Sequence, residues 1–298
     1  MHIDLLIAAT GFAVGVVVGL TGMGGGALMT PLLVLLFKIQ PLAAVSSDLV
    51  AAFVMKPVGA GVHLRRGTVH LDLVKWLVLG SVPAAFSGVL LLKALGDGAV
   101  VQDRIKLVLG AALLIAAASI LAKQRVAARR SAAGTPGEPP VARPLATVLV
   151  GVAGGLIVGL SSVGSGSLMI VLLLVLYPQL SARELVGTDL VQAIPLVGSA
   201  ALGHLLFGDF RLGVTASLLL GSLPGVYVGA RISSRAPDAL IRPILVFVLT
   251  LSGLKLLGAS NSVVGACIAV AAVLGAVVAV RKRQARVVLD APVPARIS

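Results

Sequence analysis

Near its start the chain carries an apolar stretch, residues 4–37, that is broken by Gly19-Leu-Thr21-Gly-Met-Gly24-Gly-Gly26. A second apolar stretch, residues 145–177, is broken in the same way by Gly159-Leu-Ser161-Ser-Val-Gly164-Ser-Gly166. As one continuous helix, either stretch would extend about 50 Å, against a membrane hydrocarbon core of about 30 Å. Each stretch is therefore either a re-entrant hairpin of two half-helices or one long, tilted helix.

The two broken stretches belong to an internal repeat. With one residue inserted, polar and helix-breaking positions continue to match beyond them: Ser47-Asp48 with Thr188-Asp189, His63 with His204, and Gly80-Ser-Val-Pro83 with Gly221-Ser-Leu-Pro224. Apolar segments align easily by chance, but glycine, proline, aspartate and histidine do so rarely. The chain therefore consists of two homologous halves.

The composition places the chain in a membrane. Of its 298 residues, 58% are hydrophobic and only 12% are charged. Even a large soluble domain leaves roughly a quarter of its surface in water, so this much apolar surface requires another apolar solvent. Abundant glycine (35 residues) and scarce aromatics (3%) favour closely packed helices over a β-barrel with aromatic girdles. The sequence thus predicts an all-α polytopic membrane protein, surrounded by the lipid bilayer.

Further apolar segments of about twenty residues are long enough to span a membrane. They are residues 42–64, 71–95, 103–122, 182–207, 212–232, 239–257 and 262–280. Together with the repeat they divide the chain into a first transmembrane repeat (1–122), a linker (123–144), a second transmembrane repeat (145–258), an extra C-terminal span (259–280) and a basic tail (281–298). Glycine and proline between residues 134 and 140 predict a flexible polar linker.

The net charge of +13 gathers beside the spans, without aromatic stacking residues, so no nucleic-acid partner is expected. Basic residues cluster in the linker and the tail, which the positive-inside rule places in the cytoplasm of a cell whose inner (plasma) membrane holds the protein. The loops at Arg65 and Arg231 then fall on this side as well, provided that each broken stretch enters and leaves on one side. We therefore expect inverted repeats, with two parallel halves as the alternative.

The glycine breaks are the main candidates for a binding site. Irregular backbone inside a membrane is tolerated where it lines a cavity, and a helix that begins there offers free N–H groups to an anion. We expect substrate contacts from Thr21, Gly22, Gly24, Gly25, Gly26, Ser161, Ser162, Gly164, Ser165 and Gly166. The alternative is that these glycines only permit close helix packing, a role that we assign to the glycines at positions 11, 15, 19, 151, 155 and 159.

Ionisable side chains within the predicted spans are the second set of candidates. Lys56 lies mid-span and either contacts the substrate or forms a structural pair with Asp48. Asp48 and Asp189 are candidates for ion coupling or gating, with N-capping of a helix as the alternative. His63 and His204 are candidates for proton relay, with a structural role near a helix end as the alternative.

Nothing in the sequence indicates an enzyme. It shows no nucleophile paired with a base, no metal-ligand spacing and no ATP-binding motif, so no cofactor or metal is expected. The expected partners are a small anion, a proton or a sodium ion as coupling ion, and lipid, and a homo-oligomer is left open. The sequence predicts a secondary transporter of a small anion, with an anion channel without ion coupling as the alternative.

The paired motifs Gly19–Pro31 and Gly159–Leu168, the Ser/Thr-Asp pairs and the two Gly-Ser-x-Pro signatures resemble the sulfite exporter TauE/SafE family over roughly residues 5–258. The resemblance implies a bacterial inner-membrane transporter of sulfite, an organosulfonate or a related sulfur oxyanion, coupled to an ion gradient. Two departures leave the substrate open. Val171 stands where the first half has Pro31, and serines replace part of the second glycine cluster.

Overall fold

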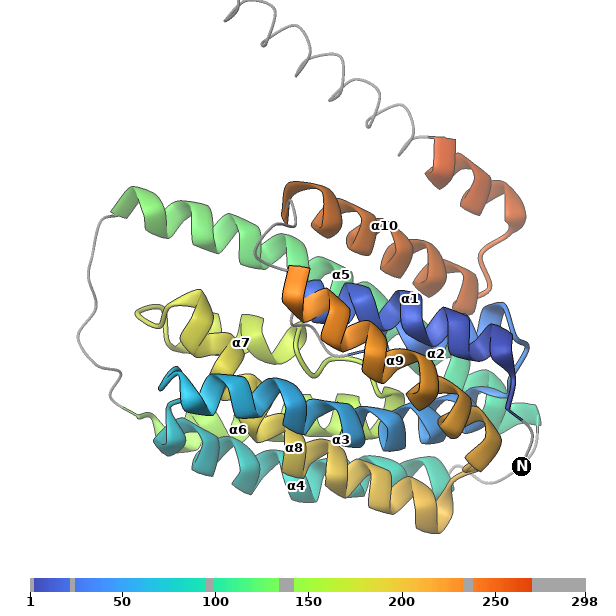
Figure 1. The fold of residues 1–298 in the computed structure, drawn as a ribbon, viewed down its shortest axis with the longest axis horizontal. Coiled ribbons are helices and arrows are strands. Elements are labelled where there is room, and N and C mark those ends of the chain that lie inside the picture. Colours follow the sequence, from blue (N-terminus) through green and yellow to red (C-terminus); the bar gives the residue numbers. More distant parts are fainter. Residues whose placement is uncertain (1–2, 22–24, 95–98, 134–141, 233–237, 270–298) are drawn as a thin grey trace, which may run out of the picture. The chain divides into compact units, whose positions relative to one another are not determined.

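The computed structural model describes residues 3–21, 25–94, 99–133, 142–232 and 238–269. These residues are mainly helical, and no strand occurs among them, so the predicted all-α fold is confirmed. The chain divides into one unit of residues 1–257 and a second of residues 258–298 (Figure 1). In the second unit residues 261–269 are helical, whereas the predicted extra span from residue 270 onward and the basic tail lie outside the described residues.

The two halves contain the same order of five helices. The first half has α1 (Leu5–Thr21), α2 (Gly26–Leu35), α3 (Pro41–Arg65), α4 (Leu71–Ala94) and α5 (Ala99–Ala133). The second half has α6 (Pro144–Ser161), α7 (Leu168–Leu176), α8 (Ala182–Phe207), α9 (Leu212–Ile232) and α10 (Asp238–Leu256). Prolines open α3 and α6, where the missing N–H costs no helical hydrogen bond. A capping box between Ser181 and Glu184 starts α8.

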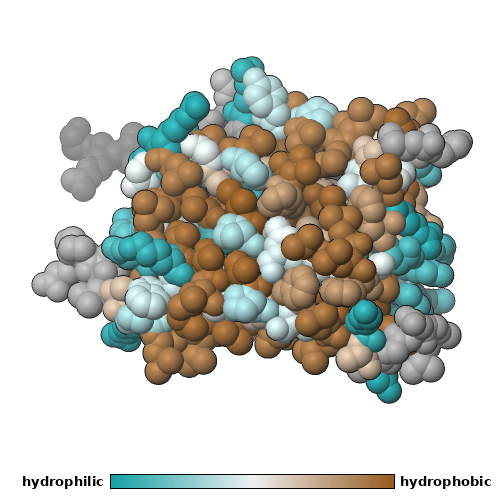
Figure 2. Space-filling model, turned by 90° about the horizontal axis from the view of Figure 1, so that it is seen from below, coloured by the Kyte–Doolittle hydropathy of each residue, from teal (hydrophilic) through white to brown (hydrophobic). Residues whose placement is uncertain are grey.

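Six helices in the described part of the chain are long and apolar enough to cross a membrane, in α3, α4, α5, α6, α8 and α9. Their outer surfaces are apolar, with Leu79 60% exposed and Leu202 53% exposed. On the face seen in Figure 2, apolar side chains cover the middle and hydrophilic side chains gather toward the edges. A belt of this kind is what lipid tails require of a multi-pass membrane protein.

Helix α5 is longer than the sequence predicted. Its backbone continues to Ala133, past the expected start of the linker at residue 123. Residues 123–133 contain no glycine or proline and are rich in alanine, so helix propensity carries the helix beyond the apolar span. Residues 134–141, the glycine- and proline-rich part of the linker, lie outside the described residues.

Each broken apolar stretch is folded back on itself as two helices. At the turn between α1 and α2, a Cβ on Gly25 would lie 3.7 Å from the Val18 side chain, while Ile7 at the other end of α1 lines one pocket with Phe37. In the second half, Tyr177 at the end of α7 accepts a hydrogen bond from the backbone N–H of Arg143, at the start of α6 (2.8 Å). In each of these two hairpins, the first helix therefore begins near the point where the second helix ends.

Helices of one half pack tightly against helices of the other through glycine. Helix α1 runs parallel to α9, where a Cβ on Gly221 would lie 1.8 Å from the carbonyl oxygen of Ala8. Helix α6 runs parallel to α4 in the same way, with a Cβ on Gly155 placed 2.4 Å from the carbonyl oxygen of Ser81. Only glycine permits such close backbone contact, so a packing role for glycines of α6 is confirmed.

The matched helices α3 and α8 lie side by side and run in opposite directions (Figure 1). Near the start of α3, Ser46 contacts His204 near the end of α8, with 2.8 Å between Oγ and Nδ1. Farther along α3, Phe53 packs on Gly198, and Gly59 packs on Leu190. As the residue number rises in α3 it falls in α8, so these two repeat-related helices are antiparallel.

Candidate functional site

The chain breaks of the two halves meet inside the first unit. A Cβ atom on Gly26, the first residue of α2, would lie 2.1 Å from the carbonyl oxygen of Ser162, just after α6. Only glycine fits this contact. Ser162 (φ 58°), Gly164 (φ 117°) and Gly166 (φ 104°) adopt left-handed backbone conformations that turn the chain from α6 into α7. We call the contact of Gly26 with Ser162 the junction.

A buried carboxylate lies at the junction. Asp48 on α3 is fully buried, and its Oδ2 accepts a hydrogen bond from the Ser162 hydroxyl (2.7 Å). The same oxygen accepts a second bond from the hydroxyl of Thr30 on α2 (2.8 Å). The other oxygen, Oδ1, has no hydrogen-bond partner among the described residues. Because the two hydroxyls come from different halves, Asp48 joins the halves at the point where both helices are interrupted.

A buried lysine lies farther along the same helix. Lys56 is attracted electrostatically to Asp189 on α8 and, more weakly, to Asp48. Asp189 also accepts a hydrogen bond from the side-chain amide of Gln192 (2.9 Å). No carboxylate oxygen of a described residue lies within 4.0 Å of the Lys56 ammonium group. The lysine therefore balances two carboxylates, one from each half, without direct contact to either.

Other predicted binding residues are placed differently. The hydroxyls of Thr21 and Ser161 donate to carbonyl oxygens of their own helices, at 2.8 Å and 2.6 Å. Ser165 is buried in the turn before α7, and Gly25 lies next to the junction residue at the start of α2. Gly22 and Gly24 lie outside the described residues. The structure thus brings Gly26, Ser162 and Asp48 together. The Ser161 hydroxyl instead bonds to the backbone of its own helix, α6.

The two predicted relay histidines differ in their surroundings. His204 is fully buried, its Nε2 donates to the carbonyl oxygen of Gly159 (2.9 Å), and its Nδ1 contacts Ser46 (2.8 Å). His63 is partly exposed, and its Nδ1 lies 2.9 Å from the hydroxyl of Thr68. His204 thus links α8 with α6 and α3. No three described His, Cys, Asp or Glu side chains group together in a way that could hold a metal ion.

The alternative that the two aspartates cap helices is wrong. Asp48 and Asp189 lie inside α3 and α8, which begin about two turns earlier. The residues before them, a serine and a threonine, accept hydrogen bonds from backbone N–H groups just before α9 and α4. The bonds join Arg211 N to Ser47 Oγ (3.4 Å) and His70 N to Thr188 Oγ1 (3.1 Å). Each bond crosses from one half to the other, at equivalent positions of the repeat.

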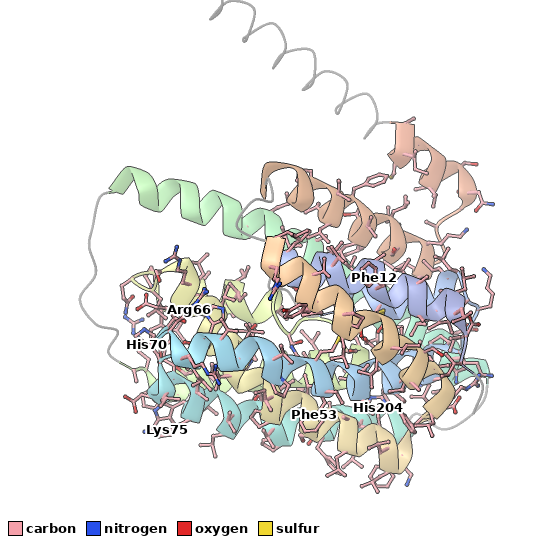
Figure 3. The ribbon with its side chains drawn as sticks, viewed as in Figure 1. Phe12, Phe53, Arg66, His70, Lys75 and His204 are labelled. Carbon is pink, nitrogen blue, oxygen red and sulfur yellow. The ribbon has the colours of Figure 1, made fainter. Side chains whose placement is uncertain are left out.

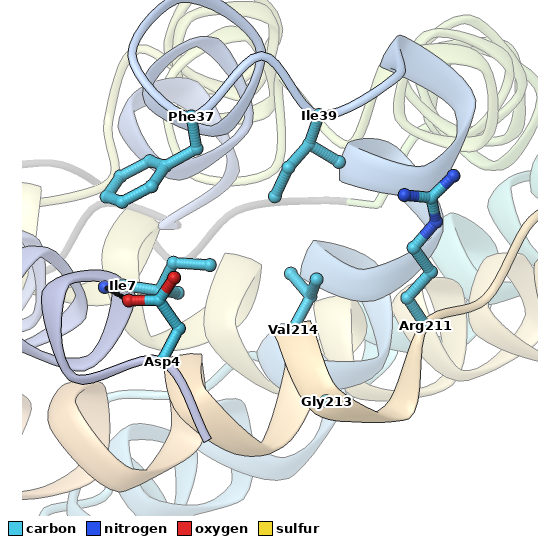
Figure 4. Close-up of a pocket in the computed structure, with 7 residues that line it drawn as sticks. All are labelled: Asp4, Ile7, Phe37, Ile39, Arg211, Gly213 and Val214. Carbon is cyan, nitrogen blue, oxygen red and sulfur yellow. Dashed lines mark hydrogen bonds between the residues drawn. The ribbon is translucent and has the colours of Figure 1, made fainter. Parts of the chain in front are cut away.

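A pocket opens at the outer end of the first hairpin. Figure 4 shows Asp4 and Arg211 beside Phe37 and Ile39 in this pocket. In the second half the position of Phe37 is held by Tyr177, whose hydroxyl contacts the Thr147 hydroxyl and the backbone N–H of Arg143. That hydroxyl ties α7 to α6, and Phe37 lacks it. The two hairpins therefore differ at the same point, and the first is the less tightly closed.

The chain matches the model of the family described as Sulfite exporter TauE/SafE over residues 7–256. It is 37% identical over 252 residues to the probable membrane transporter protein YjnA of Bacillus subtilis. The aligned residues make up 84% of this chain and 98% of that relative. A second probable membrane transporter of that organism, YdhB, is 25% identical over 255 residues, or 85% of this chain and 100% of the relative. No solved structure matches the chain.

Proposed function

Because the chain belongs to the sulfite exporter TauE/SafE family and is a membrane transporter, we propose that it is a secondary transporter of a small sulfur oxyanion. Sulfite or an organosulfonate is the proposed substrate, and an ion gradient is the proposed driving force. The observation that carries this proposal is the junction, where the interrupted helices of both halves meet beside hydroxyl groups and an ionisable trio of side chains.

The junction has the chemistry of an anion site. Helix α2 begins at Gly26, and the N–H groups of Leu28 and Met29 bond to the carbonyl oxygen of Gly25, which leaves those of Gly26 and Ala27 without a carbonyl partner inside the helix. They carry partial positive charge, and glycine allows a ligand to approach them closely. The Ser162 hydroxyl donates to Asp48 Oδ2 in this structure, and it would supply a donor from the other half after turning from Asp48 toward the anion. Tetrahedral sulfur oxyanions offer several acceptor oxygens to such a set of donors.

We propose further that the halves are inverted repeats and that both hairpins are re-entrant. The antiparallel course of α3 and α8 supports this arrangement, as do the parallel pairs α1 with α9 and α6 with α4. Each of the two parallel pairs joins non-equivalent helices of the two halves. This is expected when a twofold axis in the membrane plane relates the halves. Exchange of the two halves' conformations would then open the site to one side and afterwards to the other.

The proposed orientation places the linker and the C-terminus in the cytoplasm of a cell whose inner membrane holds the protein. Helices α4, α6 and α8 begin at one end, where Arg66, His70 and Lys75 gather (Figure 3). Helices α1 and α9 begin at the other end, where Asp4 donates its backbone N–H to Ser217 (2.9 Å). The positive-inside rule assigns the first end to the cytoplasm.

Cysteine labelling tests this orientation. In a Cys267→Ser background, an impermeant maleimide added to intact cells should label a cysteine at Asp209 and leave one at Arg66 unlabelled, because the two loops face opposite sides. Both should react after permeabilisation, which is the control for reactivity. Labelling of both positions from outside intact cells would contradict the inverted arrangement.

A thermal-shift screen of the purified protein tests the substrate class. Sulfite, sulfate, thiosulfate, sulfoacetate, methanesulfonate and simple carboxylates are compared at equal ionic strength. Sulfite or an organosulfonate should raise the melting temperature in a saturable manner, since a ligand that binds the folded state stabilises it by mass action. The shift should be smaller in Ser162→Ala. Equal melting-temperature shifts for all anions, in both proteins, would show a nonspecific effect of salt. That result would contradict the proposal.

A further inference from the structure

We propose that Asp48 carries the coupling proton: its carboxyl group is protonated when the anion binds at the junction, and one proton crosses the membrane with each anion. This inference rests on the proposed function, because it names the ion that drives the same site. The proton binds Asp48 Oδ1, turns the carboxylate into a neutral acid, and leaves again as a proton when the anion is released. Proton and anion therefore move in the same direction.

The balance of buried charge is the first argument. Among the described residues, the buried side chains of the Asp, Glu, Lys, Arg and His types are Asp48, Lys56, Asp189 and His204. One lysine faces two aspartates, and its electrostatic attraction is stronger toward Asp189 than toward Asp48. With all three ionised, one lysine cannot neutralise two aspartates, so one negative charge is left over at the junction. A second negative charge beside it would be costly in this water-poor interior, and a proton on Asp48 removes that cost.

The hydrogen bonds of Asp48 give the second argument. Both hydroxyl partners, Ser162 and Thr30, bond to Oδ2, and Oδ1 has no partner among the described residues. A buried oxygen without a partner is unfavourable, so this atom is available for a new bond. Once protonated, Oδ1 becomes a donor, and an oxygen of the substrate anion is the acceptor that such a donor needs. Both hydroxyl groups point their hydrogens at Oδ2. Hydrogens in this position would repel a metal cation, so the arrangement favours a proton over a metal ion as the coupling ion.

Comparison of the two halves gives the third argument. The positions that correspond to Thr30 and Ser162 in the repeat are Ile170 and Gly22, neither of which has a hydroxyl group. Asp189 instead accepts a bond from Gln192 and attracts Lys56. The two aspartates are therefore equivalent by descent but not in their surroundings. Asp48 accepts hydroxyl hydrogen bonds from both halves, so a movement of one half against the other would change its surroundings.

The remaining charged groups on the elements that pack against α3 lie near the ends of their helices. Apart from His204, which bonds to Gly159 and Ser46, they lie near helix ends and are at least partly exposed among the described side chains. On α3 itself they are His63 and Arg65; on α5 Asp103, Arg104 and Lys106; on α8 Arg183 and Glu184; and on α9 and its start Arg231 and Arg211. Helix α2 contributes none. These groups do not supply the missing charge at Asp48.

Transport of radiolabelled methanesulfonate in proteoliposomes tests the inference, because the charge of this anion does not change with pH over the range used. Two assays are run on wild type, Asp48→Asn and the matched surface control Asp209→Asn. Counterflow at equal pH reports whether the anion site works. Accumulation under an imposed proton gradient reports coupling, and about one pH unit should drive up to about tenfold accumulation at one proton per anion.

We expect wild type and Asp209→Asn to show both activities. In Asp48→Asn, proton-driven accumulation should be lost and any remaining counterflow should no longer change with pH, because the amide neither binds nor releases the coupling proton. Continued proton-driven accumulation in Asp48→Asn, or accumulation driven by sodium in wild type, would overturn the inference. No counterflow in wild type would instead overturn the proposed function for organosulfonates, and with it the premise.

If Asp48→Asn does not fold, Ser162→Ala and Thr30→Val keep the carboxyl group and remove one hydroxyl each. A lost bond to the charged form favours the protonated form. The pH at which transport is half-maximal should therefore rise by roughly one unit in each variant. An unchanged pH profile in both variants would show that Asp48 does not carry the proton.

Discussion

Gly26→Ala is expected to abolish anion binding and transport. Its methyl group would lie 2.1 Å from the carbonyl oxygen and 2.7 Å from the hydroxyl oxygen of Ser162, so the two chain breaks must separate. Overpacking of this kind costs about 1–3 kcal/mol or more in the free energy of unfolding. The measurement is counterflow in proteoliposomes together with the melting temperature in detergent, and we expect the first to be lost even where the second falls only moderately.

Gly25→Ala is the matched control for this variant. A Cβ there would lie 3.6 Å from the Met55 side chain, which is an ordinary contact, and the backbone of Gly25 is already helical (φ −60°, ψ −28°). The control should lose far less transport than Gly26→Ala, because its methyl group leaves Ser162 in place. Equal loss in both variants would show that glycine is needed at this turn for flexibility, and not for close approach to Ser162.

The second large effect is expected at Lys56. Replacement by methionine keeps the apolar length of the side chain but leaves Asp189 and Asp48 without their buried counter-charge. Breaking a buried charge pair by removal of one partner typically costs about 3–5 kcal/mol. Because Lys56 contacts neither carboxylate directly, chemical denaturation of Lys56→Met should show a loss below this range, and anion affinity should fall as well, because the site becomes more negative.

A double-mutant cycle identifies the partner of Lys56. Because the attraction is stronger toward Asp189, Lys56→Met with Asp189→Asn should recover more stability than Lys56→Met with Asp48→Asn. Additive effects in both pairs would mean that the lysine stabilises neither aspartate. Lys56→Arg, which keeps the charge but replaces a compact ammonium with a wide planar group, serves as the control for charge alone.

Much of the fold could be predicted because local features of the sequence determine where its helices begin. Apolar runs end at glycine, proline and charge, so α3, α4, α8 and α9 begin within one residue of the predicted spans. The matched Ser-Asp and Thr-Asp pairs indicate the repeat from the sequence alone. The end of α5 was missed because hydropathy reports the membrane span, whereas alanine-rich polar sequence prolongs a helix without apolar periodicity.

The site was predicted less completely, since its contacts join helices that are far apart in sequence. Thr30 and Gln192 gave no signal of their own, because a single polar residue in an apolar helix does not reveal its partner. The sequence offers the substrate or Asp48 on the same helix as the partner of Lys56, whereas the stronger electrostatic attraction is to Asp189, which comes from the other half. The capping alternative failed because apolar residues before Asp48 continue the helix backward to Pro41.

The sequence could not distinguish Gly25 from Gly26 either. Both stand in one glycine run, and only the position of Ser162 across the junction shows which of them has no room for a side chain. Contacts between the two halves, and not the composition of each glycine run, determine which glycine has no room for a side chain.

Counterflow of radiolabelled sulfite at equal pH on both sides tests the central claim most directly. Proteoliposomes are loaded with excess unlabelled sulfite, and trace label is added outside. A carrier that alternates between two sides exchanges the label inward, so we predict a transient accumulation of label above its equilibrium level with wild type and none with Gly26→Ala. Label that only rises to equilibrium would indicate a channel, and equal flux through wild type and Gly26→Ala would remove the transport site from the junction.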